Sequence, residues 1–325
     1  MARFRSPSPG LPLVVVEPDH EPSLDQVDRA EVISQYKAHG ALLFHGFRAG
    51  LEEFNRLARD LCATAVVNES PGRLPLDPQR SLYNVDGGDR AFALHPEMSR
   101  EPWKPDLAMF CCLSPPGEGG RTTACDGIAL ARALPPHIRE GLEGRRLIYL
   151  KAAWPSLLQY WLGTETPSDD QLRNPPPGCP YALMRLNDGR VARYFSRPAL
   201  HKPMFADELA FGNFLLFARF NNNQPNFPLL DDYTPVPGEW LEEIKAIGDR
   251  LSVAVTWQKG DLLLLDNTRF MHGRTAITDP GERIIATYFG YLKFALPNPE
   301  EPADPIWRRK DFEPPRPPDH MVPAR

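Results

Sequence analysis

The sequence predicts a mainly β fold, a sandwich or barrel with peripheral helices packed on its outside. Short apolar runs of strand length recur along the chain between Gly, Pro, Asn and Asp turn signals. Amphipathic helical spacing occurs in only a few segments, and no internal repeat is visible. Many short strands combined with few helices are typical of this class.

The first part of the chain predicts a strand between two helices. Residues 24–38 carry apolar side chains at helical spacing, and Gly40 ends the pattern. Residues 41–44 are wholly apolar, as in a buried strand, and residues 54–62 return to helical spacing. We expect both helices to pack outside the sheet.

The next segments continue this alternation. Apolar runs over 107–113 and 122–125 predict two strands, separated by Pro and Gly turn signals. Residues 128–143 have helical spacing, which Pro135 and Pro136 are expected to split.

The pattern loosens from about residue 151 to 236, where loop-forming residues are frequent. A stretch of this kind inside a domain is commonly a lid or a substrate-binding insert. Asp188-Gly189 between apolar flanks predicts a hairpin within it. Regular spacing then returns, with a helix expected over 239–251 and strands over 253–257, 262–265 and 284–289.

Composition indicates an ordinary soluble enzyme with a small-molecule substrate. Apolar residues make up 42% and charged residues 24% of the 325 residues, and the net charge is −5. Lys and Arg are scattered, so no nucleic-acid groove is expected. The five cysteines form no CxxC pair, and no secretion signal or membrane-spanning run is present. We therefore expect reduced thiols, a cytoplasmic location and no membrane partner, while the oligomeric state cannot be predicted.

Two distant segments carry side chains that suit one metal ion. If His95 and Glu97 lie on a strand, they share a face, and Pro96 favours that extended geometry. His272 follows a buried strand and precedes Gly273, which allows close approach of the backbone to a ligand. Two imidazoles and one carboxylate are the ligand set of non-haem Fe(II) oxygenases. Taken singly, each of these residues is equally compatible with an ordinary loop or core role.

Two further residues are candidates for holding a carboxylate. Arg283 opens the last apolar strand, and its planar guanidinium can bind a carboxylate through two hydrogen bonds. Thr123, on a predicted strand, can add a hydroxyl. The alternatives are a surface ion pair for Arg283 and an unremarkable strand position for Thr123.

These residues together resemble the Fe(II)/2-oxoglutarate-dependent oxygenases of the taurine dioxygenase and clavaminate synthase-like group, the TauD/TfdA family. The family pattern is HxD/E, then Thr or Ser, then His, then Arg. Here 25 residues separate Glu97 from Thr123, 148 separate Thr123 from His272, and 10 separate His272 from Arg283. The likeness extends from about residue 40 to 294.

The resemblance implies a double-stranded β-helix (jelly-roll) core and a complete set of cofactors. His95, Glu97 and His272 would bind Fe(II), and Thr123 and Arg283 would hold 2-oxoglutarate. With O₂ as co-substrate, the reaction would hydroxylate an unactivated C–H bond and release succinate and CO₂. We expect a single domain over 1–325, with the jelly-roll over about 12–296, the insert over about 151–236, and a Pro-rich tail over 297–325.

Comparison with particular members of the family narrows the expected substrate and the expected type of reaction. Taurine-type enzymes carry a second arginine four residues after the first, where this chain has Thr287, so taurine is not the expected substrate. Related halogenases lack the carboxylate ligand, whereas Glu97 is present. The segment around His95 is more similar to members that modify amino acids or amino-acid-derived natural-product intermediates, either free or tethered to a carrier protein.

Candidate substrate contacts are Asn84, Arg197, Asn222 and Arg274. The alternatives are loop capping or a solvated surface position for the first three, and an ion pair with Asp266 for Arg274. Desaturation, epoxidation and cyclisation use the same ligands as hydroxylation and stay open. A zinc hydrolase is a second hypothesis, although no HExxH occurs and Arg283 would have no function in it. A non-catalytic jelly-roll binding protein is a third.

Overall fold

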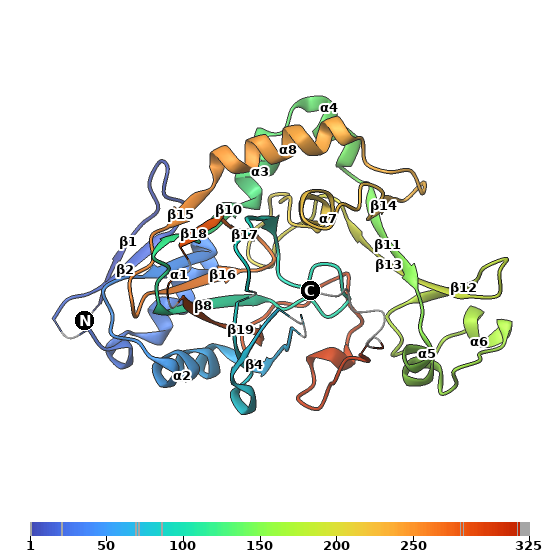
Figure 1. The fold of residues 1–325 in the computed structure, drawn as a ribbon, viewed down its shortest axis with the longest axis horizontal. Coiled ribbons are helices and arrows are strands. Elements are labelled where there is room, and N and C mark those ends of the chain that lie inside the picture. The colour runs from blue at the N-terminus through green and yellow to red at the C-terminus, as the bar shows by residue number, and fades with distance from the viewer. Residues whose placement is uncertain are drawn as a thin grey trace.

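The computed structural model describes residues 2–20, 22–68, 70, 72–85, 87–279, 281, 283–316 and 318. Two sheets that face each other form its body (Figure 1). Among the described residues the larger sheet has nine strands in the order β1-β2-β3-β16-β8-β19-β6-β5, with β4 also paired to β19. They are β1 (Ala2–Arg5), β2 (Val14–Pro18), β3 (Ala41–Phe44), β4 (Cys62–Ala65), β5 (Pro75–Asp77), β6 (Leu82–Asn84), β8 (Leu107–Ser114), β16 (Leu262–Asp266) and β19 (Ile284–Leu292).

The smaller sheet holds the metal-site segments. Its order is β15-β10-β17-β7, all antiparallel, with β7 (Phe92–His95), β10 (Thr122–Asp126), β15 (Val253–Val255) and β17 (Phe270–Arg274). Two opposed sheets, antiparallel except for the parallel pair β2–β3, with helices outside them match the predicted fold class, the double-stranded β-helix (jelly-roll).

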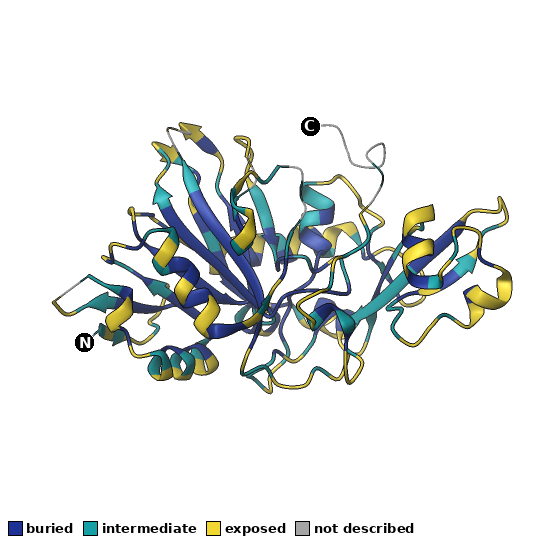
Figure 2. Cartoon of the chain, turned by 90° about the horizontal axis from the view of Figure 1, so that it is seen from below, coloured by how far each residue is buried: buried dark blue, intermediate teal, exposed yellow. Residues whose placement is uncertain are grey.

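Both faces of the larger sheet are buried, which explains its unbroken apolar runs. On β16, Leu263 and Leu265 belong to the core between the two sheets, whereas Leu262 and Leu264 pack toward the outer helices. Figure 2 shows these central strands as buried, and much of the helical surface as exposed. The core therefore has two layers, one on each side of the larger sheet.

Helices cover the outer faces of both sheets. The described helices are α1 (Arg29–His39), α2 (Leu51–Leu61), α3 (Gly127–Ala133), α4 (Pro136–Leu142), α5 (Pro155–Leu162), α6 (Asp169–Arg173), α7 (Leu215–Phe220) and α8 (Gly238–Leu251), with short 3-10 turns at Leu24–Gln26, Pro78–Arg80 and Ile306–Arg308. The first two pack on the larger sheet, and α3, α4, α7 and α8 pack beside the smaller one (Figure 1).

Local sequence explains where these helices begin and end. Asp28 caps α1 by accepting a hydrogen bond from the Ala30 amide, so α1 begins at residue 29 and not at 24 as predicted. It ends at Gly40, whose φ of 77° is readily adopted only by glycine. The prolines after residue 134 divide the predicted 128–143 helix into α3 and α4, because Pro136 lacks an N–H group and suits a helix start.

The segment predicted as an insert contributes a separate four-stranded sheet in the order β12-β13-β11-β14. Its strands are β11 (Arg146–Ala152), β12 (Ala182–Arg185), β13 (Val191–Pro198) and β14 (Leu229–Leu230). In Figure 1 this sheet and the helices α5 and α6 project to one side of the body. A short pair, β9 (Glu118–Gly119) with β18 (Ile277–Asp279), completes the described sheets.

The last described residues pack against the body. Arg308 binds the buried carboxylate of Asp106 through two hydrogen bonds of 2.8 and 2.9 Å and also pairs with Glu301. No described helix combines the length and the apolar character that crossing a bilayer needs.

Candidate active site

His95 is the last residue of β7, and its imidazole is fixed by the backbone. Its Nδ1 lies 2.8 Å from the Ala93 carbonyl oxygen, which accepts the ring N–H and leaves Nε2 for a metal. The strand ends there, because Pro96 has no N–H for the ladder, and Glu97 begins a turn. The prediction that His95 and Glu97 share a strand face was therefore wrong, although the turn still brings Glu97 to the site.

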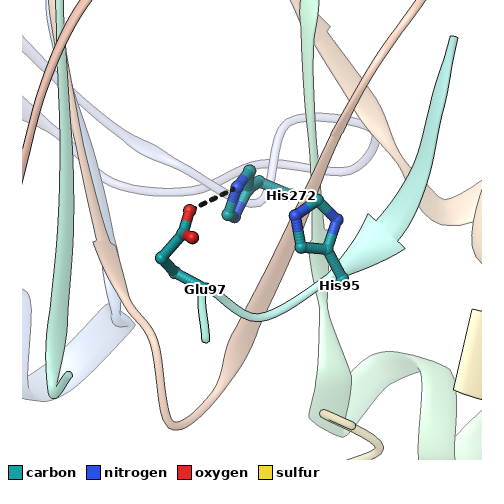
Figure 3. A group of neighbouring side chains, drawn as sticks. All are labelled: His95, Glu97 and His272. Carbon is teal, nitrogen blue, oxygen red and sulfur yellow. Dashed lines mark ion pairs between the residues drawn. The ribbon is translucent and has the colours of Figure 1, made fainter. Parts of the chain in front are cut away.

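His272 lies within β17, directly opposite His95 in the strand register. The two ring centroids are 4.5 Å apart, and His272 Nε2 is 3.6 Å from Glu97 Oε2. One ligand atom from each of the three side chains lies within 4.8 Å of the others (Figure 3). The pairing of β7 with β17 and the turn after His95 therefore bring all three side chains together.

Asn267 holds the Glu97 segment in place. Its Oδ1 accepts a 2.7 Å hydrogen bond from the Glu97 amide, and its Nδ2 donates to the carbonyl oxygens of Glu97 and Pro105 at 3.0 and 2.8 Å. Since Asn267 sits in the turn between β16 and β17, one buried amide joins the turn that carries Glu97 to the hairpin that carries His272. Sequence reasoning missed this role.

Two side chains from the loop after β4 contact the Glu97 carboxylate. Asn68 Nδ2 donates to Oε1, and an Arg73 nitrogen lies 3.0 Å from Oε2. Arg73 also donates to the Thr287 hydroxyl at 3.0 Å. A guanidinium from a distant loop therefore reaches the strand position where taurine-type enzymes carry their second arginine.

The charge states of the ligands suit metal binding. Burial, with a smaller effect of His272, lowers the pKa of His95 to about 3, so this imidazole is neutral near pH 7. Burial acts to raise the pKa of Glu97, but Arg73 and the two histidines outweigh it and hold this pKa well below its usual range. A neutral His95 imidazole and an ionised Glu97 carboxylate suit an Fe(II) facial site, to which His272 adds the second imidazole. The residues present therefore fit the metal.

The three ligands face a cavity of about 730 Å³. Phe110 and Phe217 line it and contact the imidazoles edge-on or tilted, with ring centroids 5.0 Å from His272 and 4.4 Å from His95. Arg283 also lines it. Burial and the neighbouring Arg274 lower the pKa of Arg283 to about 10, and among the described residues its Nε has no hydrogen-bond partner. A half-buried arginine in this state is suited to binding an anion.

The structure does not bring Thr123 to this cavity and places Thr122 there instead. Thr122 pairs opposite Arg274, and Thr123 pairs opposite Gly273. Because side chains alternate along a strand, Thr122 shares the face of His272 and Arg274. Its hydroxyl accepts from Trp257 Nε1 at 3.1 Å and retains its own proton to donate. The sequence spacing could not distinguish two adjacent threonines.

The four predicted substrate contacts lie in different places. Asn222 lines the cavity. Arg274 also lines it, and in the described contacts its guanidinium donates to the carbonyl oxygens of Gly88 and Arg90, with no ion pair to Asp266 among them. Asn84 and Arg197 are not among the lining residues.

Asn84 and Arg197 have structural partners instead. Asn84 Oδ1 accepts from the Ile285 amide at 3.0 Å, and Arg197 donates to the carbonyl oxygens of Glu101 and Pro102 at 3.0 and 2.9 Å. Each bond ties two segments of backbone together.

Several lining residues were not predicted. They come from the turn after Glu97, from the insert sheet and from the C-terminal segment, and are Arg100, Glu101, Trp103, Lys151, Trp154, Arg193, Pro314 and Pro315. One signal was available, since Arg193 interrupts an otherwise apolar strand pattern. The others lie on segments whose proximity depends on the tertiary fold.

Comparison with known proteins agrees with this geometry. A family model described as taurine catabolism dioxygenase TauD, TfdA family matches residues 9–288. No curated protein matches the chain.

Several solved structures share the fold. A taurine dioxygenase from Burkholderia xenovorans is 12% identical, with 91% of each chain covered and a TM-score of 0.60. PvcB from Pseudomonas aeruginosa is 16% identical, with 92% of this chain and 94% of the other covered and a TM-score of 0.55. AAD-2, solved with Mn(II) and N-oxalylglycine, is 12% identical, with 92% and 100% covered and a TM-score of 0.56.

At these identities the solved structures establish the fold, and the family follows from the match over most of the chain. The His-Glu-His cluster could hold the metal ion. The chain therefore belongs to the taurine catabolism dioxygenase TauD, TfdA family, and it is an oxidoreductase that depends on Fe(II) and 2-oxoglutarate, with O₂ as co-substrate.

Proposed function

We propose that this oxygenase hydroxylates an unactivated C–H bond of a small amino acid or amino-acid-derived natural-product intermediate. The observation that carries the proposal is the cluster of His95, Glu97 and His272, which opens into a cavity large enough for the keto acid and a second molecule. Fe(II) with 2-oxoglutarate supplies the oxidation of such a bond by O₂, with release of succinate and CO₂.

The chain's own residues bind and orient the reactants. Arg283 would hold the distal carboxylate of 2-oxoglutarate, and Thr122, in place of Thr123, would donate its hydroxyl to the same group. Asn267, Asn68 and Arg73 keep Glu97 oriented. The aromatic walls keep water from the reacting carbon.

Two observations support the substrate class. Thr287 already bonds the Tyr83 carbonyl oxygen and Arg73, so the taurine-type sulfonate contact from this position is absent among the described residues. PvcB, which shares the fold, is described as an Fe, alpha-ketoglutarate dependent oxygenase from an isonitrile synthetic pathway. A separate observation concerns the reaction: halogenation requires that the carboxylate ligand be missing, and in this chain Glu97 is present.

The decisive experiment is optical. Purified protein with Fe(II) and 2-oxoglutarate, without oxygen, should develop a weak visible charge-transfer band. Glu97→Ala and His272→Ala should abolish the band. His201→Gln, which changes another histidine bonded to a backbone carbonyl, should retain it. A metal-loaded protein without the band would contradict the proposal and favour the zinc hydrolase.

A product screen then separates the remaining outcomes. Free and carrier-bound amino acids are incubated with the complete enzyme, and succinate is measured beside product mass. A gain of one oxygen indicates hydroxylation or epoxidation, whereas a loss of two hydrogens indicates desaturation or cyclisation. Conversion of only the carrier-bound forms would establish a tethered substrate.

A further inference from the structure

A second charged cluster lines the cavity that contains the metal ligands. It consists of Arg100 and Glu101, in the turn after Glu97, and of Lys151 and Arg193, on the adjacent insert strands β11 and β13. We call these four residues the distal cluster. The function proposed above gives it no role.

Arg193 is the unusual member of the distal cluster. Its side chain is 3% exposed and contacts two aromatic rings, with its guanidinium carbon 4.9 Å from the Trp154 ring and 4.5 Å from the Tyr181 ring. Its closest described charge partner is Glu101, at 3.8 Å, which is too long for a hydrogen bond. Its Nε has no partner among the described residues, and neither has the indole N–H of Trp154, which lines the same cavity.

The strand register places another cation beside Arg193. Lys151 is directly opposite it in the β11–β13 pair, an arrangement in which like charges repel. Glu101 lies between them, 3.4 Å from Lys151 Nζ, and Arg100 is 3.9 Å from Glu101 as well. The Glu101 carboxylate is therefore the shared ion-pair partner of three cations, and its N···O distances to them are 3.4, 3.8 and 3.9 Å.

Arg193 is a buried cation without a close anionic partner, which is unfavourable since a desolvated charge requires a partner. An anionic group of a ligand would supply that partner, and the guanidinium and the indole N–H offer it hydrogen bonds. A ligand ammonium fits less well, because Glu101 is already surrounded by positive charge. The planar guanidinium, which presents paired N–H donors, matches a carboxylate best.

We propose that the substrate carries a carboxylate, remote from the oxidised carbon, that binds to Arg193, Lys151 and Trp154 in the distal cluster. The proposal rests on the function proposed above and adds the charge of the substrate and the part of the cavity that recognises it. Arg283 would bind the keto acid, and Arg193 would bind the substrate, both along one cavity.

The test compares three probes that share a carbon skeleton: 3-phenylpropionate, 3-phenylpropionamide and 3-phenylpropylamine. Binding is measured by calorimetry on protein loaded with Mn(II) and saturating 2-oxoglutarate, which occupies the keto-acid site without turnover. The carboxylate should bind at least about tenfold more tightly than the amide or the amine, the loss expected when one charge-assisted contact is missing. Equal binding of the three probes, including no binding of any, would overturn the proposal, as would tightest binding of the amine.

Variants assign the effect to the cluster. Arg193→Met should weaken the carboxylate about tenfold or more and leave the amide unchanged, while Arg139→Gln, on an exposed arginine of α4, should change neither. Because Arg193→Met removes a poorly compensated buried cation, its melting temperature should equal or exceed that of the unchanged protein. A large fall in melting temperature with carboxylate binding intact would show a purely structural arginine.

Lys151→Met provides an independent check that leaves the ring stack on Arg193 in place. It should also weaken the carboxylate selectively, and unchanged binding in both variants would refute the site. The charge-transfer band with Fe(II) and 2-oxoglutarate should persist in both variants. Absence of the band in the unsubstituted protein would refute the proposed function. Presence of the band without a preference for the carboxylate probe would refute only the role of the distal cluster in binding the substrate.

Discussion

Asn267 is the residue on which the position of Glu97 depends. We expect Asn267→Ala to weaken metal binding by about 10- to 100-fold, the usual effect of losing a side chain that orients a ligand. Metal affinity can be measured by calorimetric titration with Mn(II). Asn213→Ala is the matched control, because Asn213 is a buried asparagine with two backbone partners away from the ligands. Equal metal affinities in the two variants would contradict the role of Asn267.

Replacing Thr122 and Thr123 one at a time with valine, which has the same shape, tests which of the two hydroxyls binds 2-oxoglutarate. Thr122→Val should raise the Kd for 2-oxoglutarate about tenfold, because it removes a hydroxyl that lines the cavity. Thr123→Val should leave this Kd nearly unchanged. The measurement is the dependence of the anaerobic visible band on 2-oxoglutarate concentration. The reverse order of effects would restore the assignment first made from the sequence.

The candidate metal ligands were easier to find in the sequence than the side chains that orient them. His95, Glu97 and His272 could be proposed as ligands because their chemical types suit the metal and because their spacing resembles the family pattern. Asn68, Arg73 and Arg193 could not, since a loop asparagine or a strand arginine is informative only when the fold places it beside a charge. Strand alternation, which depends on register, is also what separates Thr122 from Thr123.

At the scale of elements, the Arg308–Asp106 ion pair is one of the contacts that hold the C-terminal segment to the body, beside the Arg146–Glu300 pair. Arg308→Met would leave the Asp106 carboxylate buried without its main partner, so the free energy of unfolding should fall by about 3 kcal/mol. Urea denaturation measures this change. Arg309→Met removes an exposed pair with Asp304 and should cost less than about 1 kcal/mol. Similar losses in both variants would mean that the Asp106 contact contributes little.

Most elements were predictable because their apolar spacing is regular. The strands at 41–44, 107–113 and 262–265 lie where the sequence placed them, with ends differing by a residue or two. The insert sheet was not predicted, apart from its Asp188-Gly189 hairpin, because its strands pair across long separations. Local patterns do not encode such pairings.

At the scale of the whole molecule, cofactor binding should raise stability by mass action. At a ligand concentration 100 times its Kd, the folded state gains about 2.7 kcal/mol. Mn(II) should raise the melting temperature, 2-oxoglutarate should raise it further, and a chelator should reverse both increases. Arg283→Met should keep the increase from the metal and lose the one from 2-oxoglutarate. A full response to 2-oxoglutarate in this variant would remove Arg283 from the keto-acid site.

Stability should also depend on pH through His201. Burial, aided by Lys104, lowers its pKa to about 3, so between there and the ordinary value near 6.5 only the unfolded chain binds this proton. Stability therefore falls as pH drops below 6.5, by up to about 1.4 kcal/mol per pH unit from this group. His201→Gln should make the acid side of the stability profile shallower, as measured by urea denaturation at several pH values. The exposed His20→Gln change is the control, and equal slopes would contradict the prediction.

Pro314 and Pro315 lie along the cavity wall, so the end of the chain bears on activity assays in a practical way. A purification tag attached on the C-terminal side would extend a segment that lines the cavity, so we expect it to alter the measured selectivity. The strand that begins at Ala2 lies at the edge of the larger sheet, beyond β2 and β3 (Figure 1). Tagging the protein at that end, and removing the tag before substrate screening, leaves the segment that lines the cavity unchanged.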